Sequence, residues 1–324
     1  MYQVAAVIPN WNGAARLERL FQALAGQIQP IVQVIVVDNG STDRSREIAA
    51  AAGADFIPLG TNTGFSHAVN CGIRQAGAEW ILILNNDVLP EPDWLENLLG
   101  TAAASEAWFA TGKLLSTTNP GQIDGSFDGL CRGACAWRFG HGRPDSQVWN
   151  QPRKISFAPL TAALFRRTLF DRAGLLDESL ESFLEDVDLG LRCAAKGLTG
   201  VYVPSAVAFH EGSATLGAWH PDTVRKISRN QLLIVAKHYP RGWILRYGWP
   251  ILVAQALWGF ITLRHGRFLA FVGGKLDAIR VFRKSRGVAC PDLARILVQS
   301  ENEIRELQKL TGFDLYWRLY FALT

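Results

Sequence analysis

Carboxylate and amide side chains recur in three short clusters near the start of this 324-residue chain. The clusters are PNWN at 9–12, DNGSTD at 38–43 and NND at 85–87. Asp38 can accept a hydrogen bond from a nucleobase or from a ribose hydroxyl. Asp87 can bind a divalent cation, because hard cations take oxygen ligands and often bridge a protein to substrate phosphates. These residue types therefore indicate nucleotide and metal chemistry.

A second set of polar residues lies in the later half of the chain. Glu185, Asp186 and Asp188 stand where a predicted helix at 187–196 begins. The helix dipole keeps carboxylates at this end ionised and able to accept a proton, although the same residues also serve as helix caps. We interpret Asp188 as a cap and Asp186 as a candidate base. His210 follows an apolar run, a position where a lone histidine is commonly structural.

The elements around the first three clusters predict a parallel sheet. Short apolar runs rich in β-branched residues indicate strands at 4–8, 32–37, 55–59 and 80–84, and the stretches between them indicate helices at 14–25, 43–52, 66–76 and 91–104. This alternation implies right-handed crossovers, and such sheets bind ligands beyond the carboxyl ends of their strands. Turn chemistry explains one polar cluster at a strand end, but three indicate a shared crevice.

The middle of the chain is less regular. Residues 105–160 are rich in glycine and weakly periodic, which predicts a region built mainly of loops. The pattern further along predicts helices at 160–173, 187–196 and 225–240, and short strands at 200–204 and 207–210.

Composition excludes several classes of protein. With 48% hydrophobic and 19% charged residues, the chain can form a large core and is not disordered as a whole. Five cysteines make no disulfide framework, and no signal peptide is expected at the start, so we expect a reducing cytoplasmic location. Neither a P-loop nor a GxGxxG motif follows the first strand, which argues against the common ATP and dinucleotide folds.

Five motifs together resemble one enzyme family. VIPNWN, VVDNGSTD, GFSHAVNCG, LNNDV and FLEDVDLGLR, in this order and spacing, are similar to the inverting family-2 glycosyltransferases, and in particular to bacterial rhamnosyltransferase-like members. The resemblance runs from about residue 4 to about residue 240. It implies a GT-A fold, an α/β class, with a nucleotide-sugar half at 1–104 and an acceptor half at 105–240. Residues 241–324 would form a helical extension.

The resemblance assigns roles to individual residues. Asn85, Asn86 and Asp87 occupy the position of the family's D-x-D motif, with an amide in place of the first carboxylate. Asp87 and His210 would hold a divalent metal, Mn²⁺ or Mg²⁺. The residues implied to contact the nucleotide sugar are Pro9, Asn10, Asn12, Asp38, Asn62, Gly64, Asn70, Asn85 and Asn86.

The catalytic step follows from the same resemblance. Asp186, with Glu185 as neighbour or substitute, matches the acidic pair that supplies the base, and Arg229 and Asn230 lie where a diphosphate or an anionic acceptor could be held. The implied donor is a dTDP- or UDP-sugar, carrying rhamnose or another hexose. The implied acceptor is a lipid-linked or polysaccharide glycan of the cell surface.

The C-terminal part carries a strong positive charge. Residues 225–295 contain fourteen Lys or Arg and two Asp, whereas the whole chain has a net charge of +4. An uncharged stretch at 247–263 precedes a basic amphipathic stretch at 267–286. These patterns fit an interfacial membrane anchor, a core or dimer helix, or a membrane span. No nucleic-acid-reading module accompanies the charge, so we expect a peripheral protein on an anionic membrane, with a homo-oligomer as an open alternative.

Two other functions compete with sugar transfer. A nucleotidyltransferase that makes sugar nucleotides should show a glycine-rich basic signature after its first strand, and PNWNGAARL differs from it. A catalytically inactive nucleotide-sugar-binding scaffold would not need Asp87 and Asp186.

Overall fold

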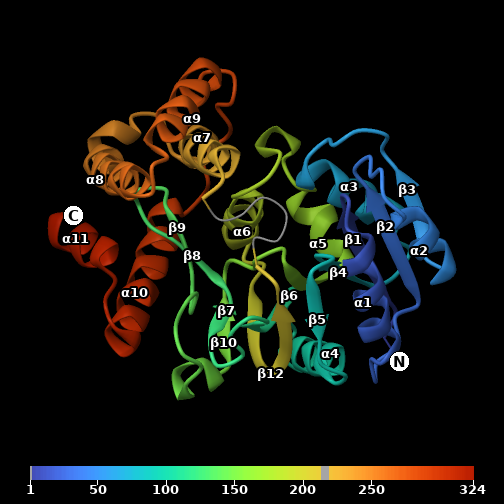
Figure 1. The fold of residues 1–324 in the computed structure, drawn as a ribbon. Coiled ribbons are helices and arrows are strands. Elements are labelled where there is room, and N and C mark those ends of the chain that lie inside the picture. The colour runs from blue at the N-terminus through green and yellow to red at the C-terminus, as the bar shows by residue number, and fades with distance from the viewer. Residues whose placement is uncertain (1, 213–218) are drawn as a thin grey trace.

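The structure is a computed structural model that describes residues 2–212 and 219–324. Its centre is a ten-stranded mixed sheet with the order β10-β12-β6-β11-β4-β1-β2-β3, to which β5 and β7 add at β12 and β6. Figure 1 shows β1–β3 at one side of the molecule and helices α7–α11 at the other.

The first four sheet strands are the predicted ones. They are β1 (Val4–Asn10), β2 (Gln33–Asp38), β3 (Asp55–Pro58) and β4 (Trp80–Leu84), all parallel. The helices between and after them are α1 (Ala14–Ala25), α2 (Ser45–Ala51), α3 (Phe65–Gln75) and α4 (Trp94–Ala104), and short β5 (Val88–Pro90) follows β4. The prediction for this half is confirmed.

Side chains of β1 show why the sheet is covered on both faces. Val4, Ala6 and Ile8 pack in a cluster with leucines of α1 and α4, whereas Ala5 and Val7 pack with α3. Buried strands of this kind read as continuous apolar runs, which is how they were recognisable in the sequence. The chain runs β1-β2-β3 in one direction and then places β4 on the other side of β1, so a topological switch point lies between β1 and β4.

The prediction of a loop-rich region at 105–160 is wrong for its first part. Residues Phe109–Ser116 form β6, a buried strand in the middle of the sheet. Its pattern is masked by Gly112, where a side chain would collide with the Ala206 carbonyl, and by Lys113, which is buried in contact with Asp145. Short elements follow: β7 (Ile123–Gly125), β8 (Asp128–Leu130), β9 (Ala136–Arg138), η1 (Gln147–Asn150) and β10 (Arg153–Ile155).

Two further predictions need correction. The expected helix at 160–173 is a strand, β11 (Ala162–Arg166), followed by α5 (Arg167–Ala173). β11 is antiparallel to both β4 and β6 and buried, and a short run buried on both faces has no periodicity to separate strand from helix. The two expected strands at 200–210 are one, β12 (Gly200–His210), with an irregular register between Val203 and Val207.

The remaining elements are helical. They are η2 (Glu178–Leu180), α6 (Glu185–Ala195), α7 (Pro221–His238), α8 (Trp243–Arg264), α9 (Phe268–Val281), α10 (Leu293–Thr311) and α11 (Leu315–Leu323). The last two helices, α10 and α11, are separated at Gly312, which has a φ of +95°. The domain boundary at 240 stays a prediction, and side chains from both sides of it share hydrophobic clusters.

Candidate active site

Hydrogen bonds join the three polar clusters at the switch point. The Asn10 amide donates to Oδ1 of Asp38 at 3.0 Å, and its Oδ1 accepts a hydrogen bond from the Asn86 amide at 2.7 Å. A Cβ atom at Gly13 would lie 2.2 Å from Asn86 Nδ2, so only glycine lets α1 begin this close. The expected convergence of the strand ends is confirmed.

Asp38 closes the turn that follows β2. Its Oδ2 accepts from the Ser41 backbone N–H at 2.9 Å and its Oδ1 from the Ser41 hydroxyl at 2.5 Å. Asn12, whose φ is +47°, accepts from the Thr42 N–H through its side chain. Both residues, with Pro9 near the end of β1, lie at the carboxyl edge of the parallel strands, and their contact with a nucleotide stays a prediction.

The loop before α3 lies against the segment that precedes α6. Asn62 accepts a hydrogen bond from the Gly64 N–H at 3.1 Å. Gly64 has a φ of +90°, and a Cβ there would lie 3.1 Å from the Glu181 carbonyl oxygen. Glycine is therefore required by both conformation and space.

Asp87 and His210 meet next to a third residue, Asp124, that the sequence did not single out. His210 Nε2 lies 3.3 Å from Asp87 Oδ1 without hydrogen-bond geometry, and that oxygen is buried with no hydrogen-bond partner among the described residues. His210 Nδ1 lies 2.7 Å from Asp124 Oδ2. Burial opposes the imidazolium, but the two carboxylates outweigh it and raise the pKa of His210 to about 9.

This arrangement suits a cation ligand pair with a supporting residue. Asp124 contacts Nδ1 of His210, whereas Asp87 faces Nε2. Asp124 therefore orients the imidazole ring and does not face the same point as Asp87. In residues 2–212 and 219–324 no group of three or more His, Cys, Asp or Glu side chains is arranged to hold a metal ion. A cation at Asp87 and His210 would need ligands from a substrate or from water, which is common for Mg²⁺ and Mn²⁺ sites.

The acidic pair at the start of α6 lies beside a guanidinium group. Arg138 Nη2 lies 3.6 Å from Asp186 Oδ2, and Arg138 also pairs with Asp128 at 3.2 Å. Asp128 and Arg138 are directly opposite each other in the β8–β9 ladder, so the register of this hairpin fixes the pair. Arg138 also donates to the hydroxyl of Thr161, whose carbonyl accepts the Asn85 N–H. These hydrogen bonds connect Arg138, next to Asp128 and Asp186, to the cluster at 85–87 that contains Asp87.

Burial and neighbouring charge alter the protonation of these carboxyl groups. Burial and the carboxylate of Asp128 raise the pKa of Asp186 to about 7, although Arg138 opposes the rise. Burial and the neighbouring Asp186 raise the pKa of Glu185 well above its usual range. A carboxyl group with a pKa near 7 is matched to general base catalysis near neutral pH.

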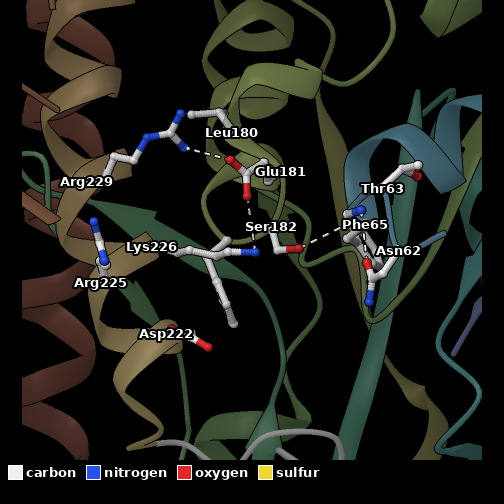
Figure 2. A network of polar contacts seen from close by, with 12 residues as sticks. Asn62, Thr63, Phe65, Leu180, Glu181, Ser182, Asp222, Arg225, Lys226 and Arg229 are labelled. Carbon is white, nitrogen blue, oxygen red and sulfur yellow. Dashed lines mark hydrogen bonds and ion pairs between the residues drawn. The ribbon is translucent and has the colours of Figure 1, made fainter. Parts of the chain in front are cut away.

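The segment before α6 has an unusual backbone. Glu181, Phe183 and Leu184 have φ values of +61°, +72° and +67°, which side-chain-bearing residues rarely adopt. Figure 2 shows how Glu181 lies between Lys226 and Arg229 of α7, and how the Ser182 hydroxyl accepts the Phe65 N–H. Such backbone strain persists only where surrounding contacts fix it, and here it precedes the acidic pair directly.

Asn230 provides the main support of this segment. It is fully buried, and its amide group donates to the carbonyls of Leu180, Ser182 and Phe183 at 2.8–3.0 Å. The predicted role of Asn230 in holding a diphosphate or an acceptor is therefore not supported, because its donors are bound within the protein. Arg229 donates to the Ser179 carbonyl and lies 3.6 Å from Glu181, so it also braces the segment.

Asn70 likewise has a structural role where a sugar contact was predicted. Its side chain is buried, donates to the Leu176 carbonyl and to Glu178, and accepts the Leu176 N–H. Asp188, interpreted from the sequence as a helix cap, is a structural residue of another kind: its described partners are side chains and not the N–H groups at the helix start. It is buried against Arg192 and His238, at 2.8 Å and 2.7 Å.

Comparison with known proteins decides the family. A family model described as "Glycosyl transferase family 2" matches residues 5–174, more than half of the chain. The chain belongs to glycosyltransferase family 2. This membership confirms the resemblance and argues against the nucleotidyltransferase alternative.

Individual relatives agree with the family. The "N-acetylglucosaminyl-diphospho-decaprenol L-rhamnosyltransferase" of Mycobacterium tuberculosis is 26% identical over 282 residues, which cover 80% of this chain and 92% of that protein. The "O-antigen biosynthesis protein RfbC" of Myxococcus xanthus is 27% identical over 223 residues, 66% of this chain and 18% of that longer protein. The chain is thus similar to glycosyltransferases of cell-surface glycan synthesis.

A solved structure confirms the GT-A-like fold. The crystal structure of GalNAc-T7 with UDP, GalNAc and Mn²⁺ superposes with a TM-score of 0.66 at 14% identity. The superposition covers 94% of this chain and 58% of that chain.

Residues that the sequence reasoning missed lie in the irregular region of this glycosyltransferase. Asp124, Asp128 and Arg138 come from β7, β8 and β9, strands of three residues each. In the sequence they are marked only by lying among other charged residues and glycines. The spacing of these charged residues does not indicate a site.

The contacts of Asn230 generate a testable prediction. Replacing Asn230 with Ala removes the donors to three backbone carbonyls around the strained segment, so we expect the free energy of unfolding to fall by about 1–3 kcal/mol and transfer activity to fall with it. Urea unfolding and a transfer assay on one preparation measure both quantities.

Asn97→Ala is the matched control. The Asn97 amide donates to a single carbonyl, that of Ser205, at the exposed side of α4. Its removal should change the stability by less than about 1 kcal/mol. Equal stability of Asn230→Ala and the original protein would contradict the bracing role.

Proposed function

We propose that this family-2 glycosyltransferase transfers a sugar with inversion, and that Asp186 is its general base. The donor is a nucleoside-diphosphate sugar, a dTDP- or UDP-sugar with rhamnose or another hexose. The acceptor is a hydroxyl of a lipid-linked or polysaccharide glycan. The observation that carries the proposal is the Asp186 carboxyl group, held at the start of α6 by Arg138 with its pKa raised to about 7. The decaprenol-linked relative supports the acceptor class.

The chain's own residues account for the chemical step. The acceptor hydroxyl oxygen forms a bond to the anomeric carbon while the bond from that carbon to the diphosphate oxygen breaks on the opposite face. The hydroxyl proton moves to an oxygen of Asp186. Arg138 and the N–H of Val187, which donates to Asp186 at 2.8 Å, hold this carboxylate in place.

The residues at the switch point fit a divalent metal. The buried and unpartnered Oδ1 of Asp87 and the imidazole of His210 are an oxygen and a nitrogen donor side by side, which suits Mn²⁺ or Mg²⁺. When bound, such an ion neutralises charge that develops on a diphosphate leaving group. The Mn²⁺ in the superposed GalNAc-T7 structure supports the proposal.

The metal proposal predicts coupled binding. We expect UDP or dTDP to bind at least about ten-fold more tightly with Mn²⁺ than with a chelator, because phosphates supply the missing metal ligands. Titration calorimetry in both conditions measures the difference. Asp87→Asn should remove the difference, whereas Asp93→Asn, on the exposed turn before α4, should keep it. Equal affinity with metal and with chelator would refute the metal assignment.

The base assignment predicts a selective loss of rate. Asp186→Asn keeps the size of the side chain but cannot take the proton, so transfer should slow by about 10²–10⁴-fold while nucleotide affinity and melting temperature stay nearly constant. Glu185→Gln is the matched control and should lose far less. If Asp186→Asn transfers within about three-fold of the original rate, Asp186 is structural and Glu185 becomes the candidate. An inactive scaffold would show no transfer in any variant.

The pKa of Asp186 predicts the pH dependence of that rate. A base must be deprotonated, so kcat/KM should rise with pH through about 7 and then level off. Arg138→Gln removes the charge that favours the carboxylate and should move this midpoint to higher pH. Arg143→Gln, which removes an arginine that pairs with Asp314 away from the site, should leave it unchanged. A rate independent of pH between 5 and 9 would contradict the assignment.

We also propose that the C-terminal helices bind an anionic membrane surface from the cytoplasmic side. α8 is long and apolar enough to cross a membrane, but 39% of its apolar window is buried in the protein, which favours an interfacial position. Leu245, Trp249, Leu252 and Phe260 form an exposed stripe along it at helical spacing. Exposed Arg246 and the excess of basic residues at 225–295 complement anionic lipid.

Membrane binding should depend on both charge and the apolar stripe. In flotation assays we expect the protein to bind vesicles that contain phosphatidylglycerol, to bind pure phosphatidylcholine weakly, and to dissociate as salt rises. Leu245→Gln/Leu252→Gln should weaken binding, while Ile28→Gln/Val32→Gln, also exposed but remote from the C-terminal helices, should not. Binding that ignores lipid charge and salt would refute the proposal.

A further inference from the structure

A cavity of about 720 Å³ lies behind the candidate active site. Its walls come from α6, from the C-terminal end of α7 and from the segments 175–179 and 284–291, and none of Asp87, Asp186 or His210 lines it. The cavity has the size of a small-molecule site. It is therefore separate from the candidate metal ligands and the candidate base.

Some of the charges around this cavity are neutralised within the protein. Arg192 is paired with Asp188 and also donates to the Ala173 and Gly174 carbonyls, so its charge is neutralised, although its Nη2 is buried without a hydrogen-bond partner among the described residues. Lys237 is paired with Asp177. These pairs account for both carboxylates among the lining residues.

Three cationic side chains on the same walls are left without a carboxylate partner. Neither Lys196 nor Lys284 has an ion pair or hydrogen bond in the described part of the chain. Arg286 donates through Nη2 to the Tyr239 carbonyl, but its Nη1 is buried with no hydrogen-bond partner among those residues. A buried, unpartnered guanidinium N–H is unfavourable unless a ligand accepts from it.

The other lining residues narrow the chemistry of that ligand. Ser179 and Ser285 add hydroxyl groups, and Leu175, Ala195 and Pro291 form an apolar wall. Val288 lies at the cavity and is 91% exposed. Unmatched Lys and Arg groups with hydroxyls bind phosphate, and an apolar wall suits a carbon chain or ring beside it.

We propose that this cavity binds a phosphate or diphosphate group carried by a partly apolar molecule, through Lys196, Lys284 and Arg286. The phosphate can belong to a lipid headgroup or to a soluble metabolite. The cavity lies near the proposed membrane-binding surface, which favours a lipid source. Phe282, just before the cavity wall, contacts Trp243 at the start of α8, next to the 96%-exposed Leu245. The site does not depend on Asp186 or on the metal.

The test uses the full chain and two probes. Pyrophosphate is titrated by calorimetry with a chelator present, so that metal-dependent diphosphate binding at Asp87 is absent. Flotation then compares phosphatidylcholine vesicles that contain phosphatidic acid, which exposes a terminal phosphate, with vesicles of equal charge that contain phosphatidylserine.

Lys196→Gln/Lys284→Gln is the informative variant, because both side chains are exposed and neither is needed for an internal pair. We expect it to weaken pyrophosphate binding by about ten-fold or more, or to remove a preference for phosphatidic acid. Lys154→Gln/Lys309→Gln removes the same charge outside the cavity and should change neither.

The two arms identify the source of the phosphate. Pyrophosphate binding without a lipid preference indicates a soluble ligand, and a preference for phosphatidic acid that the cavity variant abolishes indicates a lipid. Absence of both, or equal effects of the two double variants, would overturn the proposal. Loss of Asp186 activity or of general membrane binding would leave it standing.

Discussion

The guanidinium of Arg138 is the physical centre of the candidate site. It pairs with Asp128, lies 3.6 Å from Asp186 and donates to Thr161, and its charge also favours ionised Asp124. Without this cation, the carboxyl groups of Asp128 and Asp186, from two separate elements, would lie together in a partly dry region and lose the charge that offsets their repulsion. The remaining architecture fixes where Arg138 lies: β8 and β9 form its hairpin, and Gly125 leaves room for its side chain, since a Cβ there would lie 2.6 Å from Arg138 Cδ.

The hairpin that carries Arg138 is itself held by the C-terminal helices. Leu130 donates its N–H to Ser300 of α10, and Glu301 binds Arg132 and the Tyr320 hydroxyl. A buried carboxylate with several donors is a rigid connection, because each hydrogen bond would be expensive to lose in a region of low dielectric. The helices beyond residue 240 therefore support β8 and β9, the strands that carry Asp128 and Arg138. Through Arg138 they help to hold Asp186, the proposed base, in place.

The sequence predicted the nucleotide half well and the acceptor half poorly, for a physical reason. In the first half each strand is a parallel, fully buried run followed by turn residues, so Asn10, Asp38 and Asp87 are marked by their position at a strand end. In the second half, Asp128 and Arg138 stand in strands of three residues with no periodicity to detect. The family resemblance assigned ligand contacts to Asn70 and Asn230, but the structure shows that their amide groups donate to neighbouring backbone carbonyls.

Those two asparagines explain how a strained segment can be kept before the proposed base, Asp186. Three of the residues 181–184 have positive φ values, which are unfavourable for side-chain-bearing residues. Asn230 on α7 donates to two carbonyls of this segment and to that of Leu180 just before it, and Asn70 on α3 binds the chain further upstream. Support from two elements on opposite sides leaves little freedom for the start of α6. Proton transfer requires the proposed base to lie within hydrogen-bond reach of the acceptor. A rigid start of α6 meets this requirement and can offset the free-energy cost of the strained backbone. Residues far from the substrate therefore set the position of Asp186.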